Sequence, residues 1–355
     1  MIASRRALAA ALSAAVLAAC GDRGGEEPPF PGPGEKKLNV YIWSEYLPKE
    51  VIDEFTKRTG IAVRYDLYDS NEPVLEKLQS GVADYDIVVP SDYMVRILIQ
   101  LKLLRPLDKA RLKNLGNLDP RFLDTSFDPK NAYSVPYVWG TTGFGYNRTK
   151  AAGPLDTWAP LFEPSNKGQI LMLDDMRECF AVALKYLGHS LNATDPAVLK
   201  QAAELLKKQK ALVKTYNSGD YENILASGDV VFAHGYNGQL AKLVRRDPQK
   251  FGYVLPKEGA TIWMDSVCIP ARARNVDSIY AFLDYILEAE VNAQIVNGIS
   301  YASANVPARK FIQPAVLNDP AIYPSESALA RCEFLEDIGE ATTLLDRYWT
   351  EIKAQ

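Results

Sequence analysis

Short apolar runs alternate with amphipathic helical segments through the first third of the folded chain, and this order constrains the fold more than any other feature. The apolar runs have the length of buried strands, and each intervening segment places its apolar side chains on one helical face. Gly60 follows the first of these segments as a helix stop. The pattern predicts an α/β fold with a mostly parallel sheet and helices on both faces. In order, the expected elements are strand 38–43, helix 49–59, strand 61–65, helix 71–80, strand 86–90 and helix 91–101.

The remainder of the chain continues in this style, and the whole is longer than one hydrophobic core usually supports, so we expect two domains. The Pro- and Gly-bearing stretch 133–146 is interpreted as a chain crossing between the domains, and 265–270 as the return crossing. Further strands are expected at 170–173, 230–233, 251–255 and 261–269, and helices at 178–187, 196–213, 235–246, 276–287, 291–296 and 341–353.

The first twenty residues are interpreted as a targeting segment. Arg5 and Arg6 precede an apolar run at 7–19, which is too short to span a bilayer of ~30 Å and is typical of a signal-peptide core. The run ends at 17–20 in Leu-Ala-Ala-Cys, which resembles the bacterial lipoprotein box and implies acylation of Cys20. An ordinary secretory peptide remains the alternative, and the arginine pair also resembles a twin-arginine signal.

Residues 21–37 are rich in Gly, Pro and Glu and cannot bury enough apolar surface to order themselves. We expect a flexible tether here, between a lipid at the membrane surface and a body that begins near Leu38. Of the three cysteines after Cys20, Cys268 lies in an apolar run and is expected to be a buried thiol. A disulfide between Cys179 and Cys332 is possible in an oxidising compartment.

Composition and motifs exclude several classes of function. A net charge of −4 without a basic stripe argues against nucleic acid. His189 and His234, the two histidines, lack the spacing of a zinc hydrolase, and neither a nucleophile elbow nor a phosphate-binding loop occurs. Asp174, Asp175 and Glu178 lack calcium-loop spacing. We therefore expect no enzyme, cofactor or metal; a glycoside hydrolase, which also uses paired acids and aromatic walls, is the enzyme alternative.

Aromatic and acidic residues gather where the expected strands end, which is where open α/β sheets bind ligands. Examples are 43–46, 91–93, 174–178 and 263–265. Aromatic faces attract cations, by roughly 2 kcal/mol when desolvated. Carboxylates form ion pairs with buried ammonium groups, and a buried ammonium without such a partner is energetically costly. A slot of rings with an acid at each end fits a slender polycation and disfavours anions.

At these positions the chain resembles the periplasmic spermidine/putrescine-binding proteins. The similarity covers about 38–353, and the matching blocks occur in order and at family-like spacing: 41–46 (Tyr-Ile-Trp-Ser-Glu-Tyr), 86–91 (Asp-Ile-Val-Val-Pro-Ser), 133–140 (Tyr-Ser-Val-Pro-Tyr-Val-Trp-Gly), 174–178 (Asp-Asp-Met-Arg-Glu) and 263–266 (Trp-Met-Asp-Ser). The resemblance implies a type II periplasmic binding protein with a ligand cleft between two lobes. The first lobe would hold 38–139 and about 267–330, the second 144–265, and 331–355 would form helices packing across both.

The resemblance also implies a polyamine ligand, spermidine or putrescine, that is delivered to an ABC permease and its ATPase, by a monomer in the periplasm. A polyamine sensor and a binding protein for another amine-bearing solute are the alternatives. The residues implied in ligand binding are Trp43, Ser44, Glu45, Tyr46, Ser91, Tyr93, Asp175, Glu178, Ser218, Tyr236, Trp263, Asp265 and Tyr301. Glu45 would meet an amine at one end, Asp175 and Glu178 an amine from the second lobe, and Asp265 a central or terminal amine.

Two departures from the family pattern leave the preferred polyamine open. Tyr236 stands where the family often has Trp, and Leu335 where spermidine binders carry Gln; Glu333 or Glu336 would substitute if the alignment slips there. Several residues also have ordinary structural interpretations. Asp174 is interpreted as a helix N-cap, Trp139 as structural near the hinge, Ser91 as a cap or a ligand contact, and Trp43 and Trp263 as core or ligand residues.

Overall fold

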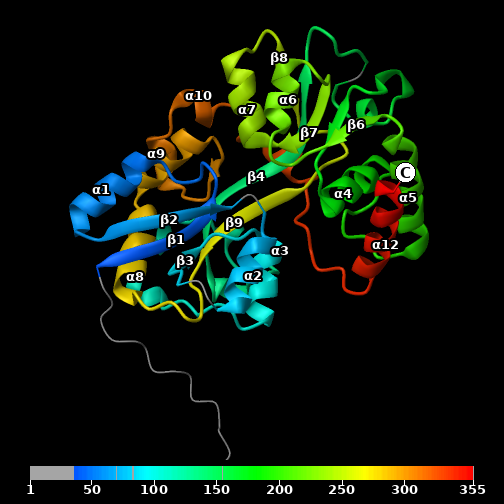
Figure 1. The fold of residues 1–355 in the computed structure, drawn as a ribbon. Coiled ribbons are helices and arrows are strands. Elements are labelled where there is room, and N and C mark those ends of the chain that lie inside the picture. The colour runs from blue at the N-terminus through cyan, green and yellow to red at the C-terminus, as the bar shows by residue number, and fades with distance from the viewer. Residues whose placement is uncertain (1–35, 69, 82–83, 154, 355) are drawn as a thin grey trace, which may run out of the picture. The chain divides into compact units, whose positions relative to one another are not determined.

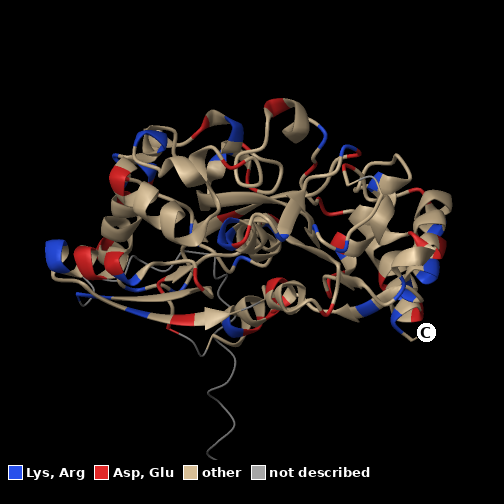
Figure 2. Cartoon of the chain, turned by 90° about the horizontal axis from the view of Figure 1, so that it is seen from above, with Lys and Arg blue, Asp and Glu red and all other residues tan. Residues whose placement is uncertain are grey.

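The computed structural model describes residues 36–68, 70–81, 84–153 and 155–354, which belong to one compact unit of the chain. The predicted signal peptide, Cys20 and nearly all of the predicted tether lie outside the described residues. No helix among the described residues is both long enough and apolar enough to cross a bilayer. Lys and Arg are interspersed with Asp and Glu over the described surface, without a stripe of one sign (Figure 2).

Ten strands within the described residues form one mixed sheet in the order β2-β1-β3-β9-β4-β7-β5-β6, and β8 and β10 pair with β4. Parallel pairing at both ends, among β1, β2 and β3 and among β5, β6 and β7, flanks the antiparallel strands β4 and β9. The strands are β1 (Lys37–Trp43), β2 (Ala62–Tyr68), β3 (Ile87–Val88), β4 (Ser134–Asn147), β5 (Ile170–Met172), β6 (Val213–Tyr216), β7 (Phe232–Tyr236), β8 (Phe251–Val254), β9 (Ile262–Cys268) and β10 (Ala302–Ser303).

Helices connect and cover these strands, as expected for a mixed α/β fold (Figure 1). The first ends at Gly60, whose φ of 70° is the left-handed stop predicted from the sequence. The helices are α1 (Lys49–Thr59), α2 (Glu72–Ser80), α3 (Asp92–Gln100), α4 (Met176–Tyr186), α5 (Pro196–Lys210), α6 (Tyr221–Ser227), α7 (Asn237–Arg246), α8 (Val276–Ile286), α9 (Ala289–Ile299), α10 (Pro314–Leu317), α11 (Glu326–Leu329) and α12 (Ala341–Lys353).

Strand β4 was not recognised as a strand in the sequence, where its glycines and Pro136 suggested only a connecting segment. All of its residues are buried, and it pairs with β9, β7, β8 and β10. A register shift between Pro136 and Val138 accommodates the proline, which cannot donate to the ladder. The sequence also missed β6, β10 and α6, and it placed the start of α7 too early, since β7 continues to Tyr236.

Two main hydrophobic cores lie along the sheet, and β4, which runs through the middle of the sheet (Figure 1), contributes Val138 and Trp139 to the first and Phe144 and Tyr146 to the second. The first includes Phe55, Leu98 and Trp139, and the second includes Trp158 and Phe180. Helix α12 packs on α5 and α4 in the second core. Because β4 contributes to both cores, the residues near its middle, and the start of β9 that pairs with them, lie where the two cores meet.

Candidate ligand-binding site

The face of β9 carries the central part of the site. Side chains alternate along a strand, so Thr261, Trp263 and Asp265 point to the same side. Thr261 and Asp265 are four strand positions apart, or about 13 Å at ~3.3 Å per residue. The indole of Trp263 therefore lies between two positions that are associated with carboxyl groups. Thr261 binds the carboxyl of Glu178, and Asp265 carries its own.

Asp265 is the carboxyl at the first of these positions. Its side chain is 3% exposed. The hydroxyl of Ser91 donates to Oδ1 at 2.7 Å, and that of Tyr46 donates to Oδ2 at 2.7 Å. Burial raises the pKa of Asp265 to about 6, although both hydroxyl donors favour the ionised form. Ser91 is the N-cap residue of α3, but its side chain makes no capping hydrogen bond there. Its hydroxyl donates to Asp265 instead.

Glu178, in the first turn of α4, is the carboxyl at the other position. The hydroxyl of Thr142 donates to Oε1 and that of Thr261 donates to Oε2, both at 2.9 Å. The side chain is 4% exposed, and burial, followed by the charge of Asp175, raises its pKa to about 8. Two threonines from neighbouring strands thus orient a carboxyl that is costly to ionise.

Asp175, and not Asp174 as predicted, is the N-cap of α4. Asp175 has extended backbone angles, and its Oδ1 accepts from the amide of Glu178 at 2.9 Å. Asp174 is exposed and its Oδ1 lies 2.7 Å from Nζ of Lys353. The N-cap is the residue directly before the first helical residue. Because α4 begins at Met176, the cap is Asp175 and not Asp174. Burial also raises the pKa of Asp175.

Asp92 is a fourth acid in this region, and the sequence prediction missed it. The side chain is 2% exposed; Oδ1 accepts from the amide of Tyr93 at 2.7 Å and Oδ2 from that of Met264 at 3.4 Å. Burial raises its pKa to about 7, with a further contribution from the charge of Asp265, and its own charge raises the pKa of Glu178. Its position between Ser91 and Tyr93, two predicted site residues, could have indicated a place in the site. Acids in the first turn of a helix are also common on protein surfaces, however, so the position alone did not identify Asp92.

The predicted rings form a connected series beside these acids. The ring centroid of Trp263 lies 5.1 Å from that of Tyr301 and 5.9 Å from that of Tyr236, and Tyr46 lies 5.4 Å from Tyr301 and 6.2 Å from Trp43. These are the edge and tilted contacts that aromatic pairs prefer. The structure thus brings together five of the six predicted aromatic residues, and Tyr93 is the one outside this series.

Two glycines make this packing possible. A Cβ on Gly140, opposite Trp263 in the sheet, would lie 2.3 Å from Cζ2 of the indole, and one on Gly238 would lie 2.3 Å from Cε1 of Tyr301. Neither ring could keep its place beside a larger residue. The indole Nε1 of Trp263 is buried and has no hydrogen-bond partner among the described residues.

Other predicted residues lie at the margin. Tyr93 is half-buried, and its hydroxyl accepts from Nδ2 of Asn71 at 3.0 Å; burial raises its pKa most, followed by the charge of Asp175. The Ser218 hydroxyl accepts from the amide of Asp174 at 2.9 Å. Ser44 is half-buried, and its amide donates to the carbonyl of Tyr68 at 3.2 Å.

Glu45 differs from the other predicted acids because it is exposed and paired. Its Oε2 lies 3.0 Å from Nζ of Lys242. In the segment near Leu335, Glu333 contacts Lys185 and Ser190, and the Glu336 carbonyl accepts from Nη1 of Arg177 at 2.9 Å. The alternative that one of these two glutamates reaches the site through its carboxylate receives no support from these contacts.

Three of these acids are buried and Asp175 is half-buried, and their carboxyls lack ionic partners in the described part of the chain. Among the residues that the structure describes, no salt bridge includes Asp92, Asp175, Glu178 or Asp265. The nearby guanidinium of Arg177 is half-buried and donates instead to the Glu336 carbonyl and, at 3.1 Å, to Oδ1 of Asn192. Ordinarily a buried carboxylate is paired or loses its charge.

Several sequence-based alternatives concern cysteine, histidine and metal. Within the described part of the chain, Cys179, Cys268 and Cys332 are all free thiols, so the possible Cys179–Cys332 disulfide is not formed; Cys268 is buried, as predicted. Burial lowers the pKa of His234 to about 3. The described residues contain no group of three acids, histidines or cysteines arranged to hold a metal ion.

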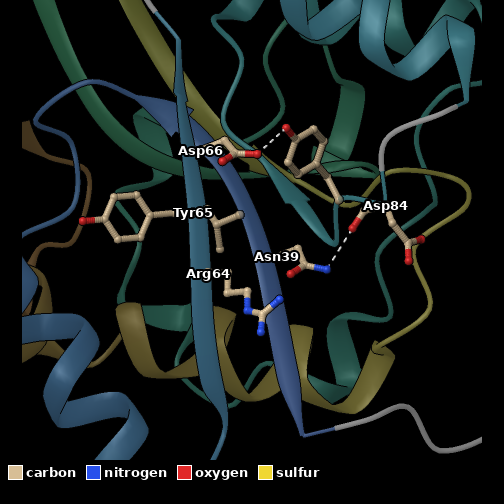
Figure 3. Close-up of a pocket in the computed structure, with 7 residues that line it drawn as sticks. Asn39, Arg64, Tyr65, Asp66 and Asp84 are labelled. Atoms are coloured by element: carbon tan, nitrogen blue, oxygen red, sulfur yellow. Dashed lines mark hydrogen bonds between the residues drawn. The ribbon is translucent and has the colours of Figure 1, made fainter.

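A surface hollow of about 340 Å³ lies elsewhere, at the edge of the sheet on β1 and β2 (Figure 3). Its charged side chains include Arg64, Asp66 and Asp84, and Oδ2 of Asp66 already accepts from the hydroxyl of Tyr85 at 2.7 Å. None of the predicted site residues lines this hollow. We assign it no role in ligand binding.

Comparison with known proteins agrees with the motifs. Residues 50–324 match the family of bacterial extracellular solute-binding proteins. The spermidine/putrescine-binding periplasmic protein of Salmonella typhimurium is 38% identical over 320 residues, which cover 89% of this chain and 91% of that protein. The putrescine-binding periplasmic protein PotF of Escherichia coli is 34% identical over 340 residues, covering 90% and 92%.

Solved structures extend the similarity to the fold. The spermidine/putrescine ABC transporter substrate-binding protein PotD of Streptococcus pneumoniae superposes with a TM-score of 0.82 at 31% identity, over 90% of this chain and 98% of that one. A lipoprotein of Treponema pallidum also gives 0.82, at 29% identity over 90% and 100%. The predicted type II fold is confirmed, and so is the expectation of a binding protein and not an enzyme. The chain belongs to the bacterial extracellular solute-binding proteins, in the group of the periplasmic spermidine/putrescine-binding proteins of ABC transporters.

Proposed function

We propose that this protein captures a polyamine outside the cytoplasmic membrane and delivers it to an ABC importer. The observation that carries the proposal is a set of four acids, the buried Asp92, Glu178 and Asp265 and the half-buried Asp175, which lie beside aromatic rings and have no ionic partner among the described residues. Protonated amines of a ligand would supply the missing positive charges. An anionic ligand would meet repulsion, and a neutral sugar would leave the acids uncompensated.

The arrangement favours an elongated cation. Glu178 is bound by Thr261, just before β9, and the backbone positions of Thr261 and Asp265 are about 13 Å apart, with Trp263 between them. Methylene groups would lie against the rings of Trp263 and Tyr301, and ammonium groups would meet the carboxylates at either end. Each cation placed on a desolvated aromatic face gains roughly 2 kcal/mol.

Residues of both predicted lobes would contribute to the site. We propose Trp43, Tyr46, Ser91 and Tyr93 on the first lobe and Tyr236 with the acids of α4 on the second, with Ser44, Glu45 and Ser218 at the margins. The first lobe would hold 38–139 and about 267–330, and the second 144–265. A ligand that contacts both lobes favours a closed arrangement only through the contacts that it gains there, which is the requirement for signalling to a permease.

Isothermal titration calorimetry of the purified protein tests the ligand class. Putrescine, spermidine, spermine, arginine and a neutral sugar should be titrated separately. We expect a dissociation constant at or below about 1 μM, roughly −8 kcal/mol, for at least one diamine or triamine. Tight binding of arginine alone would support another amine-bearing solute, and indifference to every di- and triamine would refute the proposal.

A polyamine sensor is the second candidate, because the same site would serve a receptor. ATP-driven uptake of labelled polyamine into vesicles that contain the partner permease separates the two functions. Transport that depends on this protein supports the importer, whereas binding without any stimulation of uptake supports the sensor.

We further propose that the mature protein is a monomeric lipoprotein, acylated at Cys20 and tethered by 21–37 at the periplasmic face of a membrane. The support is the lipobox-like sequence at 17–20 and the short apolar run before it. Mass spectrometry of the membrane fraction should find a diacylglyceryl thioether on Cys20, and Cys20→Ala should release the protein from membranes. Sedimentation of the released form tests for the monomer.

A further inference from the structure

One ion pair lies beside the series of unpaired acids. Oε2 of Glu45 is 3.0 Å from Nζ of Lys242, on α7, and the two side chains are 73% and 35% exposed. Glu45 has a φ of 62°, unusual for a residue other than glycine, in the turn between β1 and Tyr46. This acid thus already has a cationic partner, whereas Asp92, Asp175, Glu178 and Asp265 have none among the described residues.

The pair is connected to the proposed site through the chain neighbours of both residues. Glu45 directly precedes Tyr46, whose hydroxyl binds Asp265. One turn before Lys242 on the same helix, Oε1 of Gln239 accepts from the hydroxyls of Tyr221, at 2.8 Å, and Tyr301. Helix α7 is therefore connected to the ring that packs on Trp263. A ligand that extends beyond Asp265 toward Glu45 would approach the ammonium of Lys242.

The charges around this end are coupled to one another. Glu222, in the first turn of α6, has its pKa raised by burial first and then by the charges of Asp220 and Glu45, while Lys242 opposes the rise. Lys242 thus acts on two acids at this end. A further ligand ammonium would either displace the ammonium of Lys242 from Glu45 or be repelled by it.

We infer that Lys242 limits the length of the polyamine by occupying Glu45, so that the site favours ligands whose ammonium groups end at Asp265. The inference rests on the proposed polyamine function and adds to it a specificity-determining residue. Like charges a few ångströms apart near a surface repel weakly, so the effect on relative affinity should be about fivefold. Longer polyamines would lose affinity relative to shorter ones.

A double-mutant cycle tests this inference with calorimetry of putrescine, spermidine and spermine. In Lys242→Met, spermine should bind about fivefold more tightly relative to putrescine, because Glu45 becomes available to its end ammonium. Glu45→Gln should shift the ratio the other way. In the double variant the gain should disappear, since no carboxylate remains at that end.

Lys242→Arg is the matched control, because it keeps the charge and should keep the parent's ratio. Lys242→Gln is a second neutral variant, and thermal unfolding of each variant checks its fold. An unchanged spermine-to-putrescine ratio in both neutral variants refutes the inference, and so does a gain that persists in the double variant. A parent protein that binds none of the three polyamines would refute the proposed function itself, which is a distinct result.

Discussion

The hydroxyl of Tyr46 donates a hydrogen bond of 2.7 Å to Oδ2 of Asp265, across 219 positions of the sequence. Ser91 donates to the other oxygen, and no cationic side chain among the described residues pairs with the Asp265 carboxyl. Such donors orient the ionised form but do not remove the cost of burying it, so the pKa remains raised, at about 6. The carboxyl is therefore already oriented, and under the proposed function a ligand ammonium would compensate its charge.

Removing the charge of Asp265 should weaken polyamine binding. Asp265→Asn keeps the size of the side chain, but it replaces one acceptor oxygen by an NH2 donor and carries no charge to pair with an ammonium, so we expect a loss of at least tenfold, about 1.4 kcal/mol, by calorimetry. The control is Asp53→Asn, an exposed acid that pairs with Lys49 on α1. Equal affinities of the parent and Asp265→Asn would show that this carboxyl does not anchor the ligand.

Removing the Tyr46 hydroxyl should weaken binding in a pH-dependent manner. Tyr46→Phe deletes one donor that favours the ionised carboxylate, so the pKa of Asp265 should rise above its present value. We expect a loss of about threefold at pH 8 that becomes larger toward pH 6, since more of the carboxyl is then protonated. Tyr285→Phe, which removes a buried hydroxyl bonded to the Val51 carbonyl, should leave affinity unchanged at both pH values.

Ligand binding should release protons between pH 6 and 8. The unoccupied site holds protons in this range because burial raises the pKa values of Asp265, Asp92 and Glu178 to about 6, 7 and 8. A bound cation favours the ionised forms, so affinity should rise as the pH increases from 6 to 8. Calorimetry in buffers with different ionisation enthalpies measures the released protons, and an enthalpy independent of the buffer would contradict this prediction.

Glu178 should make the unliganded protein less stable as the pH rises. Its folded-state pKa, about 8, exceeds the usual 4.5, so the native state binds more protons than the unfolded state between these values. The free energy of unfolding therefore falls as the pH increases toward 8. Glu178→Gln should remove this contribution, and its Tm should exceed the parent's by a few degrees more at pH 8 than at pH 5.

The comparison of Glu178→Gln with the parent cancels the pH dependence of groups outside the site. A saturating polyamine should restore the parent's Tm at pH 8 but have less effect on the variant, which binds it less tightly. Parallel curves of Tm against pH for the two proteins would show that Glu178 ionises as readily in the folded chain as in the unfolded chain.

A methyl group at position 140 should displace the indole of Trp263. Gly140→Ala places a Cβ 2.3 Å from Cζ2 of the ring and also close to Oδ1 of Asn237, so either the ring or the strand must move. We expect reduced polyamine affinity. The free energy of unfolding should fall by about 1 to 3 kcal/mol, and the Tm should fall with it. Gly116→Ala is the matched control, because nothing lies within 4 Å of its Cβ position.

Much of the local structure could be predicted because it depends on near neighbours. The apolar period of α1, its stop at Gly60 and the extent of α12 follow from interactions within a few residues, and the predicted bounds of both helices agree with the structure. The rings at 43, 263 and 301 were identified from their motifs, and they do lie together. The predicted cap of α4, Asp174, is one residue before the actual cap, Asp175, and this difference is within the usual uncertainty of helix ends.

What the sequence determined alone is the alternation of strands and helices, and the concentration of rings and acids at the strand ends, because side-chain period and turn chemistry are local. Only the tertiary structure decided how these acids differ. Thr142 and Thr261 orient Glu178, Asp92 is buried against Met264, and Lys242 neutralises Glu45. Each of these contacts joins segments far apart in the chain. Burial and pairing, which set the charge of a carboxyl, arise only when β4 and β9 bring those segments together.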